Sequence, residues 1–176
     1  MPGDLLEAGV WRGGASMFMR AVLQAYDDPT RRVWAADSLQ GLPRPRPGVW
    51  RDDERLPLSE FANTLAVPLE QVRTNFECYG LLDDRVRFLP GWFHETLPTA
   101  PIERLAPIRL DGDMDESTQT AIRALYPKLA PGGYCIVDDY YSHSGARQAC
   151  TEYREEHNIV GPIHQIDWSG AYRRHT

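Results

Sequence analysis

Short apolar runs alternate along the chain with longer segments whose hydrophobic residues recur every three or four positions. The runs predict β-strands of a buried parallel sheet, and the longer segments predict amphipathic helices. Strands are expected near residues 5–8 and at 32–37, 85–90, 108–111 and 134–139, and helices at 15–26, 68–79, 117–129 and 145–157. In the first helix, one face carries the apolar residues Met17, Phe18, Ala21, Val22 and Ala25.

This order of elements predicts an α/β fold with a parallel sheet and helices on both faces. Residues 163–167 and 171–174 are expected to form a closing hairpin around Ser169 and Gly170. Residues 38–57 are rich in Gly and Pro, which predicts an irregular loop that is either a substrate lid or disordered. A short helical turn is expected at 59–63, and we see no internal repeat or domain boundary.

The first predicted strand runs into a glycine-rich turn, in the stretch from Glu7 through Gly9 to Gly13 and Gly14. Glycine lets backbone N–H groups approach a ligand closely, so this turn could hold a cofactor that carries a nucleotide. A strand–turn–helix with glycines is also compatible with a tight connection that carries a surface acid. Both interpretations stay open at this point.

Acidic residues follow four of the predicted strands, and they are Glu7, Asp37, Asp111, Asp138 and Asp139. Ligands of open parallel sheets bind at the carboxyl ends of the strands, so we expect these acids to form a functional site. Asp37 ends the second strand, where an acid accepts hydrogen bonds from ribose hydroxyls. The segment Gly91-Trp92-Phe93 provides an aromatic wall for adenine, or else it packs into the core. The turn lacks the third glycine of a dinucleotide fingerprint, which favours S-adenosylmethionine over NAD.

The remaining acids suggest a metal site. Carboxylates at the ends of neighbouring strands lie close enough to share one ion, and oxygen ligands suit Mg²⁺ or Mn²⁺. Asp138 and Asp139 would face opposite ways inside a regular strand, so both can bind a metal only if the strand ends at or before Asp138. Otherwise one of them caps a helix or bonds to the backbone.

Composition narrows the class of protein. The net charge of −6 over 176 residues argues against a nucleic-acid-binding surface, which needs basic residues to neutralise phosphates. No apolar run is long enough to span a membrane and no signal peptide is visible, so we expect a cytoplasmic protein without a membrane partner. Three widely spaced cysteines fit reduced thiols better than disulfides or a zinc site.

Five ordered motifs resemble those of the macrocin O-methyltransferases, S-adenosylmethionine- and Mg²⁺-dependent enzymes that methylate sugar hydroxyls of macrolide and aminocoumarin antibiotics. The motifs are Glu7–Gly14, Asp37–Pro43, Gly91–Phe93, Leu110–Met114 and Val137–Tyr140. The resemblance implies a Rossmann-like class I methyltransferase fold, with a mostly parallel seven-stranded sheet, helices on both faces and a C-terminal antiparallel hairpin. It also implies that residues 1–176 form one methyltransferase domain without the N-terminal helical segment of family members, which contributes to substrate binding and oligomer contacts.

The resemblance implies a role for each site residue. The methionine end of the cofactor would contact Glu7, Gly9, Trp11, Arg12 and Gly13, the ribose Asp37 and Ser38, and the adenine Gly91, Trp92 and Phe93. Asp111, which also lies beside the cofactor, Asp138 and Asp139 would bind the metal. Asp113 would be the general base that accepts the proton of the acceptor hydroxyl, with His143 as the rival base.

The expected function is therefore methylation of a sugar hydroxyl on a glycosylated natural product, a small-molecule acceptor. Two alternatives remain: a catechol-type O-methyltransferase with the same metal chemistry, and a non-catalytic relative that binds the cofactor. A homo-oligomer is compatible with either function.

Overall fold

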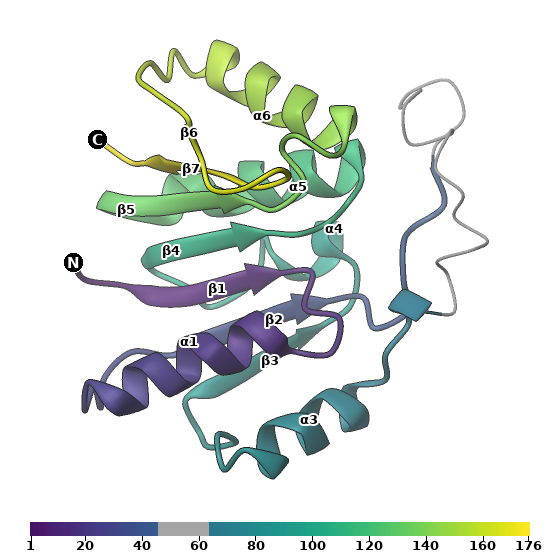
Figure 1. Cartoon of the computed structure of the whole chain (residues 1–176), viewed down its shortest axis with the longest axis vertical. Helices are drawn as coiled ribbons and strands as arrows, with labels where there is room; N and C mark the ends of the chain where they lie inside the picture. The colour runs from purple at the N-terminus through teal and green to yellow at the C-terminus, as the bar shows by residue number, and fades with distance from the viewer. Residues whose placement is uncertain (46–63) are drawn as a thin grey trace.

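The computed structural model describes residues 1–45 and 64–176, and within these residues seven strands form one sheet (Figure 1). The strand order is β3-β2-β1-β4-β5-β7-β6. The strands are β1 (Asp4–Ala8), β2 (Val33–Asp37), β3 (Val86–Pro90), β4 (Leu105–Leu110), β5 (Leu129–Val137), β6 (His164–Gln165) and β7 (Ala171–Arg174). The first five strands run parallel, and β7 is antiparallel to both β5 and β6. The predicted mostly parallel sheet with a C-terminal hairpin is confirmed.

Helices cover both faces of this sheet, as predicted (Figure 1). They are α1 (Gly14–Ala25), α3 (Leu69–Cys78), α4 (Phe93–Thr96), α5 (Asp115–Leu125), the 3₁₀ turn η2 (Tyr126–Lys128) and α6 (Ser144–Glu156). Side chains of α5 and α6 join the larger core cluster with Leu6 and Ile108 of the sheet. On the opposite face α3 contributes Val72 and Phe76 to a second cluster, and α1 contributes Leu23 to a third.

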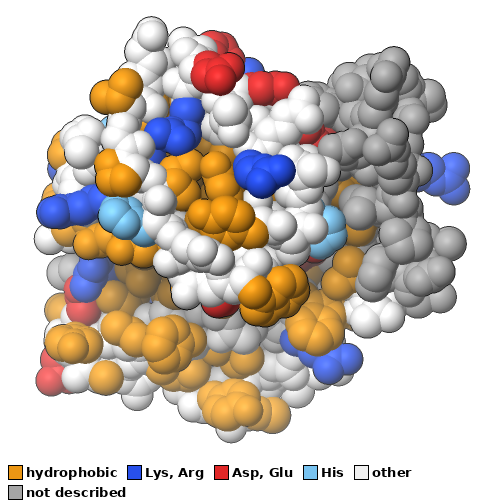
Figure 2. Space-filling model, turned by 45° about the horizontal axis from the view of Figure 1, so that its top comes forward, with side chains coloured by type: hydrophobic (Ala, Val, Ile, Leu, Met, Phe, Trp, Pro, Cys, Tyr) orange, Lys and Arg blue, Asp and Glu red, His pale blue; other side chains and the backbone are white. Residues whose placement is uncertain are grey.

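The buried face of α1 differs from the apolar face seen in the sequence. Phe18 is 71% exposed, whereas Ser16, Arg20 and Leu23 are buried. The two polar residues face inward because each has a partner from elsewhere in the chain: Ser16 donates to Glu7, and Arg20 pairs with Asp83. Figure 2 shows that hydrophobic side chains also lie at the surface of the molecule, among charged and uncharged groups.

The last parallel strand begins earlier than predicted. The Pro131-Gly132-Gly133 segment was expected to precede the strand, but it lies within β5 as an irregular stretch, and the pairing with β4 shifts register there. A Cβ on Gly133 would lie 2.6 Å from the Ala106 carbonyl oxygen, so only glycine allows this approach. The preceding helix ends at Leu125, since Pro127 cannot continue its hydrogen bonding.

The carboxyl ends of the central strands are tied together by backbone hydrogen bonds. Gly9 N–H donates to Ala36, Asp111 N–H to Ala8 and Asp138 N–H to Leu110, each over 2.8–2.9 Å. The residues that follow β1, β4 and β5 therefore leave the sheet side by side.

Two further expectations concern the connections. The loop at 38–57 is described only as far as residue 45, and the turn at 59–63 lies outside the described residues. Among the described helices, none is long and apolar enough to cross a membrane.

Candidate active site

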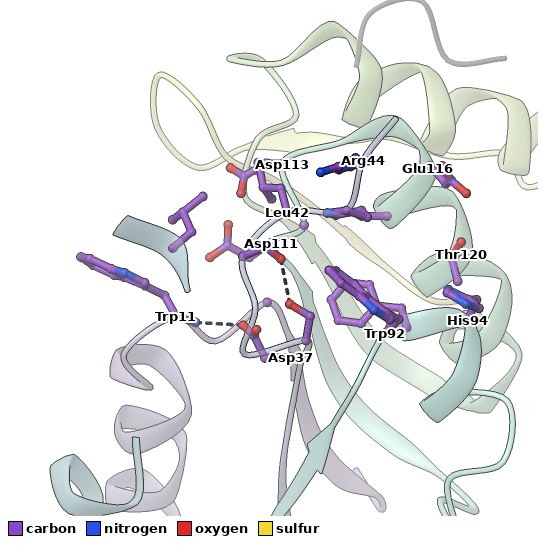
Figure 3. A pocket seen from close by; sticks show the side chains of 18 residues that line it. Trp11, Asp37, Leu42, Arg44, Trp92, His94, Asp111, Asp113, Glu116 and Thr120 are labelled. Atoms are coloured by element: carbon purple, nitrogen blue, oxygen red, sulfur yellow. Dashed lines mark hydrogen bonds between the residues drawn. The ribbon is translucent and has the colours of Figure 1, made fainter. Parts of the chain in front are cut away.

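A cavity of 460 Å³ lies at the carboxyl edge of the sheet (Figure 3). Eight predicted site residues line it: Gly9, Trp11, Asp37, Ser38, Trp92, Phe93, Asp111 and Asp113. The structure adds residues that the sequence reasoning missed, including Leu42, Arg44, Leu65, His94, Gly112, Glu116, Ser117 and Thr120. Its volume falls within the range of small-molecule and cofactor sites, about 300–1,000 Å³.

The glycine turn after β1 forms one wall of the cavity because it packs directly on the segment that follows β4. Gly9 has φ +92°, and a Cβ there would lie 1.7 Å from the Asp111 carbonyl oxygen. Gly13 has φ +88° and precedes α1. No other residue type fits at Gly9, so the turn and Asp111 have a fixed relative position.

The Asp37 carboxylate connects the end of β2 to the glycine turn. Its Oδ2 accepts hydrogen bonds from the backbone N–H groups of Val10 and Trp11, at 2.7 and 3.1 Å. Its Oδ1 accepts one from Leu39 at 2.7 Å. Asp37 lines the cavity at the same time. Because Oδ2 already accepts two hydrogen bonds and Oδ1 only one, the carboxylate keeps acceptor capacity on Oδ1 for a ligand.

Aromatic residues form another part of the cavity wall. Trp92 and Phe93 line it at the start of α4, a short helix that was not predicted, and Phe93 also packs against the larger core cluster. His94 and Thr120 lie near Trp92 in Figure 3. Phe93 therefore packs against the core and also lines the cavity, while its contact with adenine stays a prediction.

The three acids predicted to bind the metal come together as predicted, and we call Asp111, Asp138 and Asp139 the acid cluster. Asp111, Asp138 and Asp139 each offer a carboxylate oxygen, and these atoms lie within 4.8 Å of one another. Because β5 ends at Val137, the condition for both of its following acids to reach one site is met. The Asp139 Oδ2 atom is buried and has no hydrogen-bond partner in the described chain. A buried carboxylate oxygen without a donor fits a cation ligand, and so does the all-oxygen set.

Burial and like charges make these acids harder to ionise. Burial, with a smaller effect of the Asp138 charge, raises the pKa of Asp111 to about 7, although Arg109 opposes the shift. Burial and then the Asp139 charge raise the pKa of Asp113 to about 6. A positive ion would relieve the repulsion between these groups.

Asp113 lines the cavity in an unusual backbone conformation, with φ +57°. Left-handed conformations are uncommon for residues other than glycine, and they concentrate at functional sites. Asp113, Asp139 and His143 also offer ligand atoms within 4.8 Å of one another. His143 does not line the cavity, and its Nδ1 lies 3.3 Å from Asp139 Oδ1.

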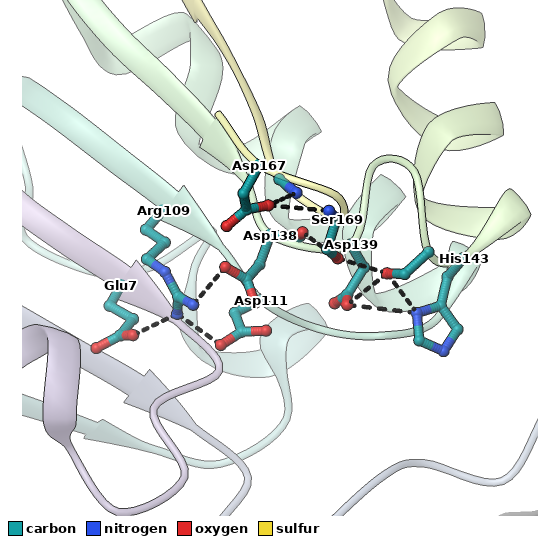
Figure 4. A network of polar contacts seen from close by, with 10 residues as sticks. Glu7, Arg109, Asp111, Asp138, Asp139, His143, Asp167 and Ser169 are labelled. Atoms are coloured by element: carbon teal, nitrogen blue, oxygen red, sulfur yellow. Dashed lines mark hydrogen bonds and ion pairs between the residues drawn. The ribbon is translucent and has the colours of Figure 1, made fainter. Parts of the chain in front are cut away.

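Glu7, Arg12, Gly13 and Gly91, which were predicted to contact the cofactor, do not line this cavity in the described part of the chain. Glu7 is only 2% exposed, so it is not a surface acid. Its carboxylate accepts a hydrogen bond from Ser16 and pairs with Arg109 at 2.6 Å (Figure 4).

Arg109 and Ser169 are further site residues that the sequence reasoning missed. Arg109 also contacts Asp111 and Asp138, at 2.5 and 2.6 Å. Ser169, at the tip of the C-terminal hairpin, donates to the Asp138 carbonyl oxygen at 2.8 Å. For Arg109, the available sequence signal was an arginine inside an otherwise apolar strand. For Ser169, no local sequence signal was available.

Comparison with known proteins agrees with this geometry. The family described as macrocin-O-methyltransferase (TylF) matches residues 1–175. The chain belongs to this family. It is 56% identical over 176 residues to the 8-demethyl-8-(2,3-dimethoxy-alpha-L-rhamnosyl)-tetracenomycin-C 4'-O-methyltransferase of Streptomyces olivaceus, covering all of this chain and 67% of that protein. It is 48% identical to the mycinamicin III 3''-O-methyltransferase of Micromonospora griseorubida, covering all of this chain and 70% of that enzyme.

Among solved structures, the O-methyltransferase NovP superposes with a TM-score of 0.97 at 49% identity, over 99% of this chain and 72% of that chain. The calicheamicin methyltransferase CalS11 superposes with a TM-score of 0.78 at 22% identity, over 99% of this chain and 72% of that chain, and supports the fold alone. The family, the fold and the assignment as an S-adenosylmethionine-dependent methyltransferase are thus confirmed.

Proposed function

We propose that this protein transfers the methyl group of S-adenosylmethionine to a sugar hydroxyl of a glycosylated natural product, with a divalent cation, Mg²⁺ or Mn²⁺, at Asp111, Asp138 and Asp139. One observation carries the proposal: Asp111 belongs both to the wall of the cavity and to the acidic cluster. The cofactor and the cation would therefore bind next to each other, with Asp111 between them. The relatives support the acceptor class, because the names of two of them specify rhamnosyl-tetracenomycin and mycinamicin as substrates.

The cavity provides suitable groups for each part of the cofactor. Asp37 would accept a hydrogen bond from a ribose hydroxyl with the lone pair that its three backbone donors leave open on Oδ1. Trp92 and Phe93 would contact the adenine ring, and the turn at Gly9 and Trp11 would lie against the methionine moiety. Asp111 and Ser38, which also line the cavity, would complete the polar contacts.

The acid cluster would hold the cation through Asp111, Asp138 and Asp139, whose Oδ2 has no other partner among the described residues. A divalent cation there would lower the pKa of the acceptor hydroxyl and orient it. Asp113 would accept the proton as the oxygen–methyl bond forms and the sulfur–methyl bond breaks. Without metal, burial and then the Asp139 charge raise the pKa of Asp113 to about 6, and a bound cation would lower it, so Asp113 is ionised at neutral pH and able to accept a proton. His143 faces Asp139 and lies outside the cavity lining, which favours Asp113 as the base.

The proposal is tested first with S-adenosylhomocysteine, a product of the reaction, in isothermal titration. The expected result is binding without any added metal, because the cavity is formed by protein groups alone. Methyl transfer to a rhamnosylated acceptor is then measured with Mg²⁺ and with excess chelator, and we expect transfer only with the metal. Failure of the folded protein to bind the cofactor product would refute the proposal.

Asp139→Asn tests the metal site, with Asp84→Asn as the control because Asp84 is exposed and outside the cluster. We expect Asp139→Asn to lose Mg²⁺-dependent transfer and to keep its affinity for S-adenosylhomocysteine. Turnover that persists in chelator would contradict the metal site. Preference for a catechol over the glycoside would contradict the proposed acceptor.

The remaining expectations stay predictions. These are that residues 1–176 form one methyltransferase domain and that the protein works in the cytoplasm, and a homo-oligomer stays compatible with the proposed function.

A further inference from the structure

The Arg109 guanidinium group lies among three carboxylates, those of Glu7, Asp111 and Asp138 (Figure 4). Arg109 Nη1 is 2.6 Å from Glu7 Oε1 and 2.5 Å from Asp111 Oδ2, while Nη2 is 2.6 Å from Asp138 Oδ1. The Arg109 side chain is 19% exposed. This single residue therefore bridges two of the proposed cation ligands and a buried acid.

The pairing of the strands brings these groups together. Glu7 on β1 is the direct neighbour of Arg109 on β4, so their side chains leave the same face of the sheet. Asp111 follows Arg109 by two positions, and Asp138 follows β5, the neighbouring strand on the other side. The arginine thus reaches from the β1 side of the sheet to the β5 side.

We infer that Arg109 is a positioning residue for the cation site, holding one oxygen of Asp111 and one of Asp138 in place, and that Glu7 anchors Arg109. This inference rests on the metal site of the proposed function. Each of the two aspartates has a second oxygen, which would be available to the cation. Asp139 is outside this ion-pair network, and its neighbours are Ser142 and His143.

Arginine suits this position because its planar group fixes the directions of several N–H donors at once. Two carboxylates with ligand oxygens within 4.8 Å of each other repel. Without a cation in the site, the pairing with Arg109 offsets that repulsion and keeps both side chains oriented. A lysine would keep the positive charge, but its single nitrogen cannot hold the same three carboxylates in this geometry.

Glu7 acts at the other end of the network. Its Oε1 pairs with Arg109, and its second oxygen accepts a hydrogen bond from Ser16 on α1. Glu7 offers no oxygen to the acid cluster and does not line the cavity. A change at Glu7 that affects metal binding would therefore act through Arg109.

The test measures Mn²⁺ binding from the electron paramagnetic resonance signal of free Mn²⁺, without acceptor, in the wild type, Arg109→Lys and Glu7→Gln. Arg123→Lys is the matched control, since Arg123 forms an exposed ion pair with Glu156 away from the site. Titration calorimetry with S-adenosylhomocysteine measures the cofactor site in the same samples, and thermal melting verifies that each variant is folded.

We expect Mn²⁺ affinity to fall about tenfold or more in Arg109→Lys and Glu7→Gln, as is usual when partners of metal ligands are removed. The affinity for S-adenosylhomocysteine should fall much less, and Arg123→Lys should match the wild type. If Arg109→Lys does not fold, Glu7→Gln decides the matter by the same two measurements.

Unchanged or tighter Mn²⁺ binding in both folded variants would overturn the inference while leaving the proposed function intact. Loss of S-adenosylhomocysteine affinity alone in Glu7→Gln would also overturn it, and would instead support direct contact of Glu7 with the methionine moiety. A wild type that does not bind Mn²⁺ would refute both the inference and the proposed metal site.

Discussion

Replacing Gly9 with alanine tests the contact between the glycine turn and the segment after β4. The added Cβ would lie 1.7 Å from the Asp111 carbonyl oxygen, which is far inside the distance that two such atoms tolerate. The atoms nearest to this Cβ all belong to the Asp111 backbone, so no side chain can rotate away to make room. Either the turn or the end of β4 must move, and Asp111 moves with it.

Two terms determine the size of the effect. A left-handed conformation costs an alanine about 1–2 kcal/mol relative to glycine, and Gly9 has φ +92°. Overpacking adds about 1–3 kcal/mol. The sum is about 2–5 kcal/mol, and a domain of this size loses about 2–4 °C in melting temperature for each kcal/mol. We therefore expect Gly9→Ala to melt about 4–20 °C below the wild type.

Substitutions at two other glycines separate the cost of the left-handed backbone from the cost of overpacking. Gly80→Ala would carry the strain of φ +64° without a steric clash, because no atom of the described residues lies within 4 Å of its Cβ. We expect it to melt about 2–8 °C lower. Gly14→Ala has open space and no positive φ, and as the first residue of α1 it should leave the melting temperature unchanged or raise it.

The assay combines thermal melting with titration of S-adenosylhomocysteine. Gly9→Ala should lose affinity for the ligand as well as stability, whereas Gly80→Ala should lose only stability, because it lies outside the cavity lining. If Gly9→Ala melts like Gly80→Ala and binds the ligand normally, the close approach of Gly9 to Asp111 does not exist.

Three further predictions follow from the structure. Asp37→Asn replaces a carboxylate oxygen that accepts backbone N–H bonds with an amide group, so we expect about 1–3 kcal/mol loss of stability by chemical denaturation and weaker S-adenosylhomocysteine binding by calorimetry. Without metal, thermal stability should rise as the pH falls from 7.5 to 5.5, because Asp111 and Asp113, with pKa values of about 7 and about 6, take up protons in the folded state before the unfolded chain does. A thiol reagent should label only Cys78 in the native protein and all three cysteines after unfolding, because Cys135 and Cys150 are buried.

Each of these predictions has a contradicting result. Normal ligand binding by Asp37→Asn would show that its contacts with the turn do not shape the cavity. The Asp113→Asn variant should gain less thermal stability on acidification than the wild type. An unchanged gain would show that other groups cause it. Rapid native labelling of Cys150, whose pKa burial raises to about 12, would contradict its buried position.

The sequence was sufficient to predict most of the strands and the acids at their ends. The run from Val33 to Ala36 is apolar because both faces of the central sheet are covered, and this pattern can be read from neighbouring residues alone. The start of β5 was harder to predict, because proline and glycine, here Pro131 and Gly132, usually interrupt strands. Here the backbone of Gly132 instead donates a hydrogen bond to the His175 carbonyl oxygen, a partner 43 residues later that no local pattern reveals.

Polar residues that face inward were the main source of error. Ser16 and Arg20 appear polar in sequence, and so the inner face of α1 was assigned to its apolar residues. Their burial depends on Glu7 and Asp83, which lie on other elements. Arg109 was missed for the same reason. Its ion pairs with Glu7 and Asp138 form because β1 and β5 lie on either side of β4.

Register explains why the site needs these particular positions. Leu110 pairs with Val137, so the next residues, Asp111 and Asp138, leave neighbouring strands at the same level. Glu7 pairs with Arg109, two positions before Asp111, which places their side chains on one face. A slip of one residue between β1 and β4 would turn Glu7 away from Arg109, and the same slip between β4 and β5 would separate the two aspartates. The proposed cation site is therefore determined by strand register as much as by the presence of the acids, and we expect a substitution that weakens this pairing to weaken Mn²⁺ binding without touching a ligand.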